Sequence, residues 1–251
     1  HDTSGTSSAT VLAAIEEGID IVDLAMDSMS GLTSQPALGS VVSIMKQNYE
    51  DPRLDEASIR EASLYWEQVR NNYKAFETDF NGGSSDVYLH QMPGGQFTNL
   101  KEQARSLGIT TDKWGLVANM YAEVNKMFGD IIKVTPSSKV VGDMALYMIT
   151  NDLSPEDVLD PNKEISFPSS VTEFFKGEIG IPLGGFPEKL QKKILGNEKP
   201  LSKRAGSVLT SINIDKVQAK LENKYEEKLS NQQVASYLMY PKVFEDFMDH
   251  R

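Results

Sequence analysis

The sequence contains no cysteine among its 251 residues. This absence excludes disulfide bonds, thiolate nucleophiles and cysteine-based zinc sites, and it fits a reducing compartment. Histidine is scarce too, with three in the chain. His90 and His250 have no spacing that would join them to His1 in one metal site. Histidine spacing alone therefore predicts no metal centre.

Basic residues are in the minority. Lys and Arg number 25 against 36 Asp and Glu, which gives a formal net charge of −11. Domains that bind nucleic acid carry a basic patch, so this balance argues against a nucleic-acid partner. It leaves small anionic substrates open, because one local cluster of Lys or Arg can bind an anion whatever the total charge.

Long hydrophobic runs are also missing. No run approaches the roughly 18 apolar residues that span a bilayer, so we expect no membrane partner. The N-terminus lacks the basic region of a signal peptide, and Glu16, Glu17 and Asp20 interrupt its apolar residues. The chain begins His1-Asp2 rather than with methionine. We therefore expect a fragment or a processed chain.

The first 48 residues read as helix, strand and helix. Small and apolar residues at helical spacing predict a helix over 6–17, which Gly18 would close. The β-branched run 19–25 predicts a short buried strand, and 37–48 a second helix. A helix–strand step is typical of an α/β barrel or sheet, and it cannot bury both its faces alone. This front section should therefore need partners outside the chain.

The remaining two hundred residues are predicted to be mainly helical, without internal repeats. Ser154 and Pro155 should open a short helix, and Pro241 should divide a final helix pair over 231–249. Prolines and glycines break 160–206 into short helices and turns. Longer helices are expected over 55–80, 99–107, 112–128, 140–151 and 215–230, and the first should bury a stripe of Ile59, Leu64, Trp66, Val69, Tyr73 and Phe76.

The run Lys133-Val-Thr-Pro-Ser-Ser-Lys-Val-Val141 is the most informative segment. Pro136 suits the first turn of a helix, and Thr135 stands beside the cap. A hydroxyl at such a junction can pass a proton or bind an anion. The alternative is an ordinary N-cap, which the spacing alone favours.

Two other segments are candidates. His1 with Asp2 stands just before a helix, where a histidine is a natural metal ligand or acid–base group, or else incidental. Gly94-Gly95 follows Pro93 and opens a helix. Its free N–H groups would suit an anion, but a tight turn for close packing is the plainer interpretation.

These segments together resemble the carboxyltransferase domain of the pyruvate carboxylase family. The resemblance runs nearly end to end, with the motifs in order. Decarboxylase and transcarboxylase subunits share Pro-Gly-Gly and Val-Thr-Pro, but typically continue with Thr-Ser-Gln, whereas this chain has Ser137-Ser138-Lys139. The motifs are His1–Gly5, Ser28–Pro36, Tyr65–Glu67, Met92–Leu100, Phe128–Asp130, Lys133–Val141, Ser166–Pro168 and Tyr240–Phe244.

The resemblance implies a fold and an activity. Residues 1–48 would be the C-terminal end of a TIM-type α/β barrel, and 49–251 a mainly α-helical funnel over its mouth. The domain would transfer CO2 from carboxybiotin to pyruvate enolate and so form oxaloacetate. This is a ligase reaction of which the present chain would carry part of the site.

Site residues follow from the same resemblance. Thr135 matches the threonine that relays a proton between pyruvate and biotin, and Ser138 matches a residue that lines the biotin pocket. His1 matches the second histidine of a His-Thr-His pair that holds a divalent metal (Mn, Zn or Mg). The other ligands and the pyruvate-binding residues would precede residue 1.

Partners and location are expectations of the same kind. Biotin would arrive on a separate carrier domain, ATP would be used elsewhere in a tetrameric parent enzyme, and the location would be the cytoplasm or the mitochondrial matrix. Two alternatives remain. One is the carboxyltransferase subunit of an oxaloacetate decarboxylase or transcarboxylase, and the other is a noncatalytic helical docking module.

Overall fold

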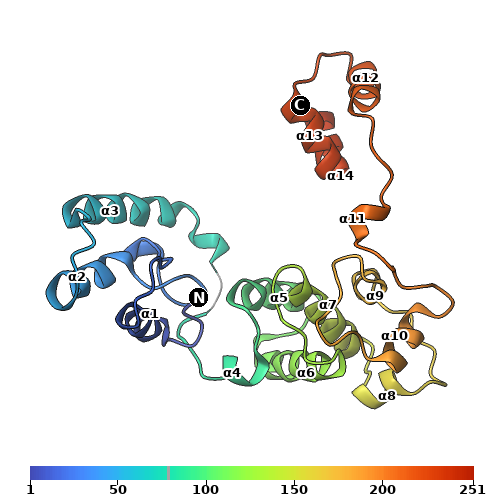
Figure 1. Cartoon of the computed structure of the whole chain (residues 1–251), viewed down its shortest axis with the longest axis horizontal. Coiled ribbons are helices and arrows are strands. Elements are labelled where there is room, and N and C mark those ends of the chain that lie inside the picture. Colours follow the sequence, from blue (N-terminus) through green and yellow to red (C-terminus); the bar gives the residue numbers. More distant parts are fainter. Residues whose placement is uncertain (78–79) are drawn as a thin grey trace. The chain divides into compact units, whose positions relative to one another are not determined.

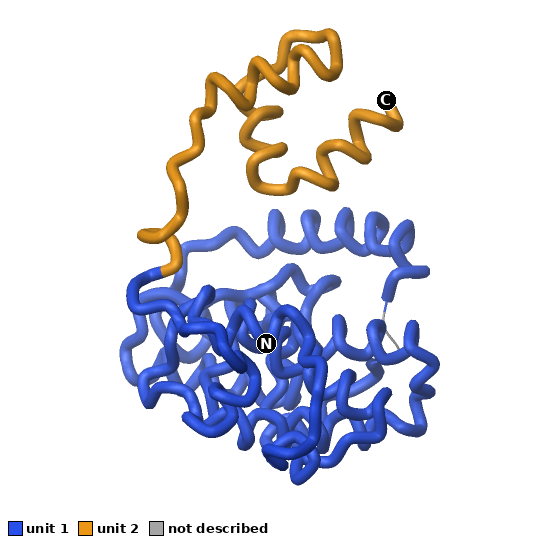
Figure 2. The backbone as a smooth tube through the Cα atoms, turned by 90° about the vertical axis from the view of Figure 1, so that its right-hand side faces the viewer, with its two compact units in different colours: residues 1–204 blue, residues 205–251 orange. Residues whose placement is uncertain are grey.

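A computed structural model describes residues 1–77 and 80–251, and the regular structure of those residues is helical (Figure 1). The chain forms two compact units, residues 1–204 and residues 205–251 (Figure 2). Short 3-10 helices cover Asp27–Met29, Lys74–Phe76 and Thr111–Lys113. The α-helices of the first unit are α1 (Ser7–Glu16), α2 (Leu38–Asn48), α3 (Glu56–Asn72), α4 (Val87–His90), α5 (Gly94–Ser106), α6 (Trp114–Met127), α7 (Ser137–Thr150), α8 (Pro155–Leu159), α9 (Ser169–Lys176) and α10 (Glu188–Leu195). Those of the second are α11 (Ala205–Val208), α12 (Ile214–Tyr225), α13 (Asn231–Met239) and α14 (Pro241–His250).

Helix α7 is the centre of the first unit. It packs against α5, α6 and α9, and α9 packs in turn against α10 (Figure 1). Val141, Met144, Ala145 and Met148 recur at helical spacing along α7, and none of them is exposed to solvent. The start of α7 is therefore held by a packed core, and the Lys133–Val141 run enters the helix at that point.

Local signals placed several helix ends correctly. Gly108 and Gly129 adopt φ of +79° and +95° just after α5 and α6, the left-handed conformation that commonly ends a helix. Ser154 forms the predicted cap of α8, in a reciprocal capping box with Asp157. Pro241 divides the last two helices as expected, because it suits the first turn of α14 and cannot continue α13.

The strand predicted over 19–25 is not formed in the described structure. These residues are coil, with one parallel bridge between Ala25 and Ala37. Ile19 and Ile21 are 51% and 79% exposed. A strand needs neighbours to accept and donate its backbone hydrogen bonds. The segment has few backbone hydrogen bonds: Ala25 bonds Pro36 and Leu38 at the start of α2, and the Ile19 amide bonds the Ala14 carbonyl.

The predicted buried stripe of α3 is also wrong. Helix α3 packs on α2 and on the 3-10 helix at 27–29, where Ser63 and Arg70 form hydrogen bonds with Ser28. An apolar stripe at helical spacing becomes buried only when another element covers it. Of the stripe, Ile59 and Val69 are half-buried, whereas Leu64, Trp66, Tyr73 and Phe76 are exposed.

Several helix boundaries differ from prediction. Helix α5 begins at Gly94 rather than Asn99, because Pro93 and the two glycines form its first turn. Helix α12 ends at Tyr225, where Glu226 turns into the left-handed region with φ of 54°. Helix α3 ends at Asn72, and the last part of the range predicted for it includes residues 78–79, which lie outside the described residues.

The second unit has a small core of its own. Leu221, Leu229, Val234 and Phe244 bring α12, α13 and α14 together. No helix in the described ranges is long and apolar enough to cross a membrane.

Candidate functional site

The Lys133–Val141 run turns sharply into α7. Pro136 is the N-cap of that helix, Ser137 its first residue, and the Thr135–Pro136 peptide bond is cis. Ser137 Oγ accepts a hydrogen bond from the Val134 amide at 3.1 Å and lies 2.8 Å from the Ile132 carbonyl oxygen, to which it donates. Ser137 therefore fixes the turn that leads into α7, and no side chain caps the helix itself.

Thr135 is consequently not an N-cap. Its side chain is exposed, and its hydroxyl makes no hydrogen bond within residues 1–77 and 80–251. Capping requires a side-chain oxygen that accepts from an N–H of the first turn, and this geometry is absent at Thr135. A threonine hydroxyl in this state can donate to one group and accept from another.

Ser138 and Lys133 flank this hydroxyl in different environments. Ser138 is 3% exposed, and its carbonyl accepts a hydrogen bond from the Tyr121 hydroxyl at 3.3 Å. Lys133 Nζ donates to Gln91 Oε1 at 3.0 Å. Partial burial lowers the pKa of Lys133, against the opposing effect of Asp130. The run thus combines a fixed serine with a cation held against the segment before α5.

The N-terminal residues are fixed against that same segment. The Asp2 carboxylate accepts from the Ser7 amide at 2.9 Å, which anchors the loop to the first turn of α1. A Cβ atom placed on Gly94 would lie 2.9 Å from Cγ and Nδ1 of His1 and 2.9 Å from Thr3 Oγ1. The close packing predicted for this glycine turn is what the geometry favours over an anion site.

His1 fits the role of a single metal ligand. Its side chain is exposed, and its ring nitrogens make no hydrogen bond with the described residues. Neutral imidazole is a common ligand of zinc and other divalent metals. The described residues contain no group of three or more His, Asp, Glu or Cys that could hold a metal. Further ligands would have to come from outside the described residues.

No hydrogen bond joins His1 to Thr135 within the described residues. Neither Thr135 nor Ser138 forms a hydrogen bond with it in the described ranges. The loop with His1 and the run with Thr135 both contact residues 91–94, at the end of α4 and the start of α5. Gln91 forms a hydrogen bond with Lys133, and Gly94 lies against His1.

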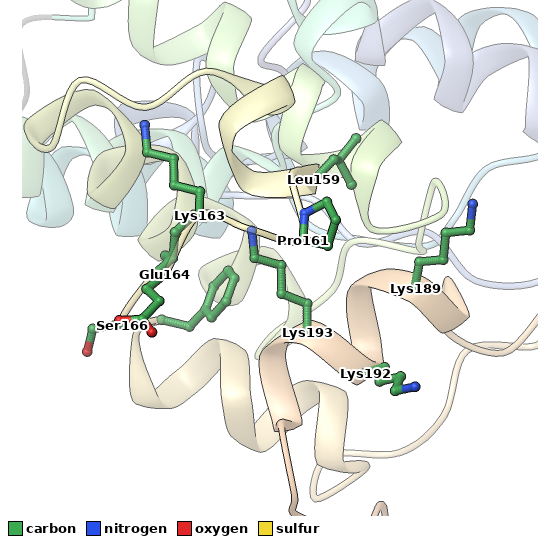
Figure 3. A pocket seen from close by; sticks show the side chains of 10 residues that line it. Leu159, Pro161, Lys163, Glu164, Ser166, Lys189, Lys192 and Lys193 are labelled. Atoms are coloured by element: carbon green, nitrogen blue, oxygen red, sulfur yellow. The ribbon is translucent and has the colours of Figure 1, made fainter.

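A wide cavity lies elsewhere in the first unit. It has a volume of about 1140 Å³ and lies between α8, α10 and the segment that joins α8 to α9, with four lysines among its lining residues (Figure 3). Lys163, Lys189 and Lys192 point in different directions, so they do not converge on one ligand (Figure 3). Lys163 pairs with Asp157 at 2.8 Å, and Lys193 binds backbone carbonyls. The geometry indicates a solvated basic surface.

A smaller cavity of about 490 Å³ is lined in part by residues of the Lys133–Val141 run, although Thr135 itself is not one of its lining residues. Val134 and Ser137, which flank Thr135-Pro136 in the chain, line one part of it. The remainder comes from apolar residues of the 129–132 turn and of the glycine-rich loop after α9, together with Phe174 and Phe186. A largely apolar cavity with a few polar groups at one edge is the common form of a small-molecule site.

Comparison with known proteins identifies the family. The family model of the conserved carboxylase domain matches residues 87–251. Pyruvate carboxylase of Bacillus subtilis is 45% identical over 248 residues, which cover 99% of this chain and 22% of that enzyme. The chain belongs to the carboxyltransferase region of the pyruvate carboxylase family.

Other members of the pyruvate carboxylase family agree. The enzyme of Schizosaccharomyces pombe is 46% identical over 248 residues, which cover 98% of this chain and 21% of that protein. This chain therefore spans about a fifth of the length of the curated relatives it matches.

Solved structures of this family have the same fold over the chain. The carboxyl transferase domain of Rhizobium etli pyruvate carboxylase, solved with pyruvate and biocytin, superimposes with a TM-score of 0.95 at 59% identity. The match covers 98% of this chain and 41% of that one. The complete multifunctional R. etli enzyme gives a TM-score of 0.93 at 58% identity, over 98% of this chain and 23% of that one.

Two contacts in this part of the carboxylase domain had little or no signal in the sequence. Gln91 and Lys133 are 42 residues apart, and nothing in their spacing predicts the hydrogen bond between their side chains. Gly94 was recognised as part of a tight turn, but nothing in the sequence predicts that its neighbour in the folded chain is His1.

Proposed function

We propose that the chain forms part of the carboxyltransferase centre of a biotin-dependent pyruvate carboxylase, which carboxylates pyruvate to oxaloacetate. The observation that carries this proposal is the free, exposed hydroxyl of Thr135 just before α7, in a run whose Val134 and Ser137 line an apolar cavity. The family membership supports it, and so does the R. etli domain solved with pyruvate and biocytin.

Thr135 is proposed to relay the proton. Its oxygen accepts the proton that leaves the methyl group of pyruvate, and its own hydroxyl proton passes to the base on its other side. No free alkoxide or bare carbanion then has to form. Biotin on its carrier would supply both the CO2 and that base. The exposure of Thr135 suits a group that must meet two reactants from outside this chain.

Ser138 and His1 have supporting roles in the proposal. Ser138 would line the biotin pocket, where its burial and the hydrogen bond from Tyr121 fix its position. His1 would be one ligand of a divalent metal, whose chemistry is to polarise the carbonyl of pyruvate and stabilise the enolate. Three or more further donors would complete that site.

The domain arrangement is proposed on the same basis. Residues 1–48 would complete a TIM-type barrel whose other strands lie outside the chain, and 49–251 would form the funnel over its mouth. The exposed apolar residues of 19–25 support this, because barrel neighbours would cover them and pair their backbone. ATP use, tetramer formation and a cytoplasmic or mitochondrial location are proposed for the parent enzyme only.

The test is substitution of Thr135 in the full-length enzyme. Thr135→Ala should lower the rate of oxaloacetate formation by about 10²- to 10⁴-fold, the usual contribution of a proton-transfer group. Carboxylation of biotin by ATP and bicarbonate should continue at the wild-type rate. Thr135→Ser is the matched control, because it keeps the hydroxyl and should retain much of the activity. Near-normal oxaloacetate formation by Thr135→Ala would contradict the relay.

A further inference from the structure

The loop that begins with His1 is enclosed by a second segment from the helical part of the chain. A Cβ atom on Gly83 would lie 2.5 Å from the backbone nitrogen of Gly5, so the two backbones are in direct contact there. Next to it, the Ser84 amide donates a hydrogen bond to the Thr3 carbonyl at 3.0 Å. The segment from Gly83 to Gly94 therefore runs along the loop and holds its backbone.

Gly94 closes the other end of this contact. Its missing side chain is what leaves room for the His1 ring and for Thr3 Oγ1, each of which would be 2.9 Å from a Cβ atom. Carbon atoms of a protein core ordinarily approach to about 3.5 Å at the closest. An alanine at this position would therefore force the imidazole to move.

Position 94 requires glycine because there is no room for a side chain, and not because of its backbone conformation. Gly94 is the first residue of α5 and does not have a positive φ, so any residue could adopt its conformation. Gly95 follows it in the same turn, and a Cβ atom on Gly95 would meet nothing within 4 Å. The two adjacent glycines thus differ in what a side chain would meet, because Gly94 is buried against His1 and Thr3 whereas Gly95 is exposed.

The immediate surroundings leave the ring few alternatives. Thr3 is 6% exposed, and its hydroxyl is buried without a hydrogen-bond partner in the described ranges. It lies against the same point of Gly94 as the imidazole. A ring displaced by a methyl group at Gly94 could not shift toward Thr3 without a clash, so it would have to rotate outward.

We propose that Gly94 is a positioning residue for His1, which sets the orientation of the imidazole toward a divalent metal. The inference rests on the proposed role of His1 as a metal ligand. It assigns to the helical carboxylase domain a part in the metal site, although none of its own side chains would touch the metal. The same segment contacts Lys133 through Gln91, which links the site to the run that carries Thr135.

The experiment compares Gly94→Ala with Gly95→Ala in the full-length enzyme. Metal content is measured by elemental analysis after purification, and Mn²⁺ affinity by titration of the metal-free protein. Gly94→Ala should weaken Mn²⁺ binding by about 10- to 100-fold, the usual effect of disturbing the support of a ligand. Gly95→Ala should bind as the wild type does. Equal affinity in the two variants would overturn the proposal.

A second measurement keeps the test decisive if Gly94→Ala folds poorly. The loss of thermal stability caused by Gly94→Ala should be smaller in a His1→Gly background, because the ring that the new methyl group meets is gone. An equal loss in both backgrounds would overturn the proposed contact.

His1→Ala separates this inference from the function on which it rests. If His1→Ala retains the metal fully, the ligand role fails, and the positioning role fails with it. If His1→Ala loses the metal and Gly94→Ala retains it with wild-type affinity, the positioning role alone is wrong.

Discussion

At the start of α7 the Ser137 hydroxyl forms the local hydrogen bonds, and the Thr135 hydroxyl forms none within the described residues. The Ser137 hydroxyl bonds the Val134 amide and the Ile132 carbonyl in the turn before α7. The Thr135 hydroxyl takes no part in these bonds and does not cap the helix. The predicted alternative, in which Thr135 is an ordinary N-cap, does not hold. Ser137 thus stabilises the turn, whereas the Thr135 hydroxyl stays available for the proposed proton relay.

Ser137→Ala should lower the free energy of unfolding by about 0.5–1.5 kcal/mol, because it removes the hydrogen bonds of the Ser137 hydroxyl to the Val134 amide and the Ile132 carbonyl. Urea unfolding of the full-length enzyme, followed by hydrogen exchange in residues 131–150, measures the change. The control is Ser106→Ala, since the exposed Ser106 hydroxyl bonds only the Gln103 carbonyl at the end of α5. Equal effects of the two substitutions would contradict the special role of Ser137.

His90 gives the protein a predicted pH dependence. Burial lowers its pKa below the ordinary 6.5, and its Nδ1 accepts a hydrogen bond from the Met92 amide. Below pH 6.5 the unfolded chain takes up a proton that the folded chain resists, so the free energy of unfolding falls with the pH. The loss should end at the lowered pKa of the folded state.

His90→Asn should remove this part of the pH dependence, because asparagine offers an acceptor oxygen to the Met92 amide but does not titrate. Urea unfolding at several pH values on both sides of 6.5 measures it, with Trp114 as the fluorescent reporter. Trp114 is suitable because Phe97 lies against both its indole and the His90 ring. An unchanged slope in the variant would assign the dependence to other groups.

At the scale of elements, a glycine sets the distance between α5 and α7. A Cβ atom on Gly142 would lie 2.5 Å from Gln96 Nε2 and 2.9 Å from Leu100 Cδ1. Both neighbours are buried, and Gln96 Nε2 has no hydrogen-bond partner among the described residues. The two helices therefore approach as closely as a glycine permits, which fixes the direction in which α7 begins.

Gly142→Ala should destabilise the protein by about 1–3 kcal/mol through overpacking. This is the opposite of the gain of about 1 kcal/mol that alanine ordinarily gives over glycine within a helix. Gly115→Ala in α6 is the matched control, because a Cβ atom there meets nothing within 4 Å. Thermal unfolding of the two variants should shift in opposite directions, and stabilisation by Gly142→Ala would contradict the close approach.

At the scale of the whole molecule, each of the two units has its own core. Phe244 is 6% exposed in the core of the second unit, whereas Phe247 of the same helix is 60% exposed. A unit of this size buries little apolar surface, so each core side chain carries a large share of its stability.

Phe244→Ala should therefore unfold residues 205–251 locally, at a cost of about 3–5 kcal/mol, and leave the first unit folded. Hydrogen exchange resolved by peptide measures this directly. Phe247→Ala is the control, and its peptides should keep the wild-type protection. Loss of protection in both units of Phe244→Ala would show that they unfold together.

The helical part of the fold was largely predictable, because its signals act within a few residues. Gly108, Gly129, Ser154 and Pro241 each satisfy or interrupt hydrogen bonds of their own turn, so no distant partner is needed to interpret them. The resemblance of the Lys133–Val141 run to the pyruvate carboxylase family is confirmed for the same reason, since a motif is a property of the sequence itself.

Burial and contact depended on the tertiary structure. The strand over 19–25 and the buried stripe of α3 were both wrong, because each required a covering element that the described chain does not supply. The free state of the Thr135 hydroxyl required knowledge of what Ser137 binds. Local signals in the sequence were enough to predict most of the helices and the family. The contact between Gly94 and His1 could be found only in the folded structure, because residues so far apart in the sequence meet only once the chain has folded.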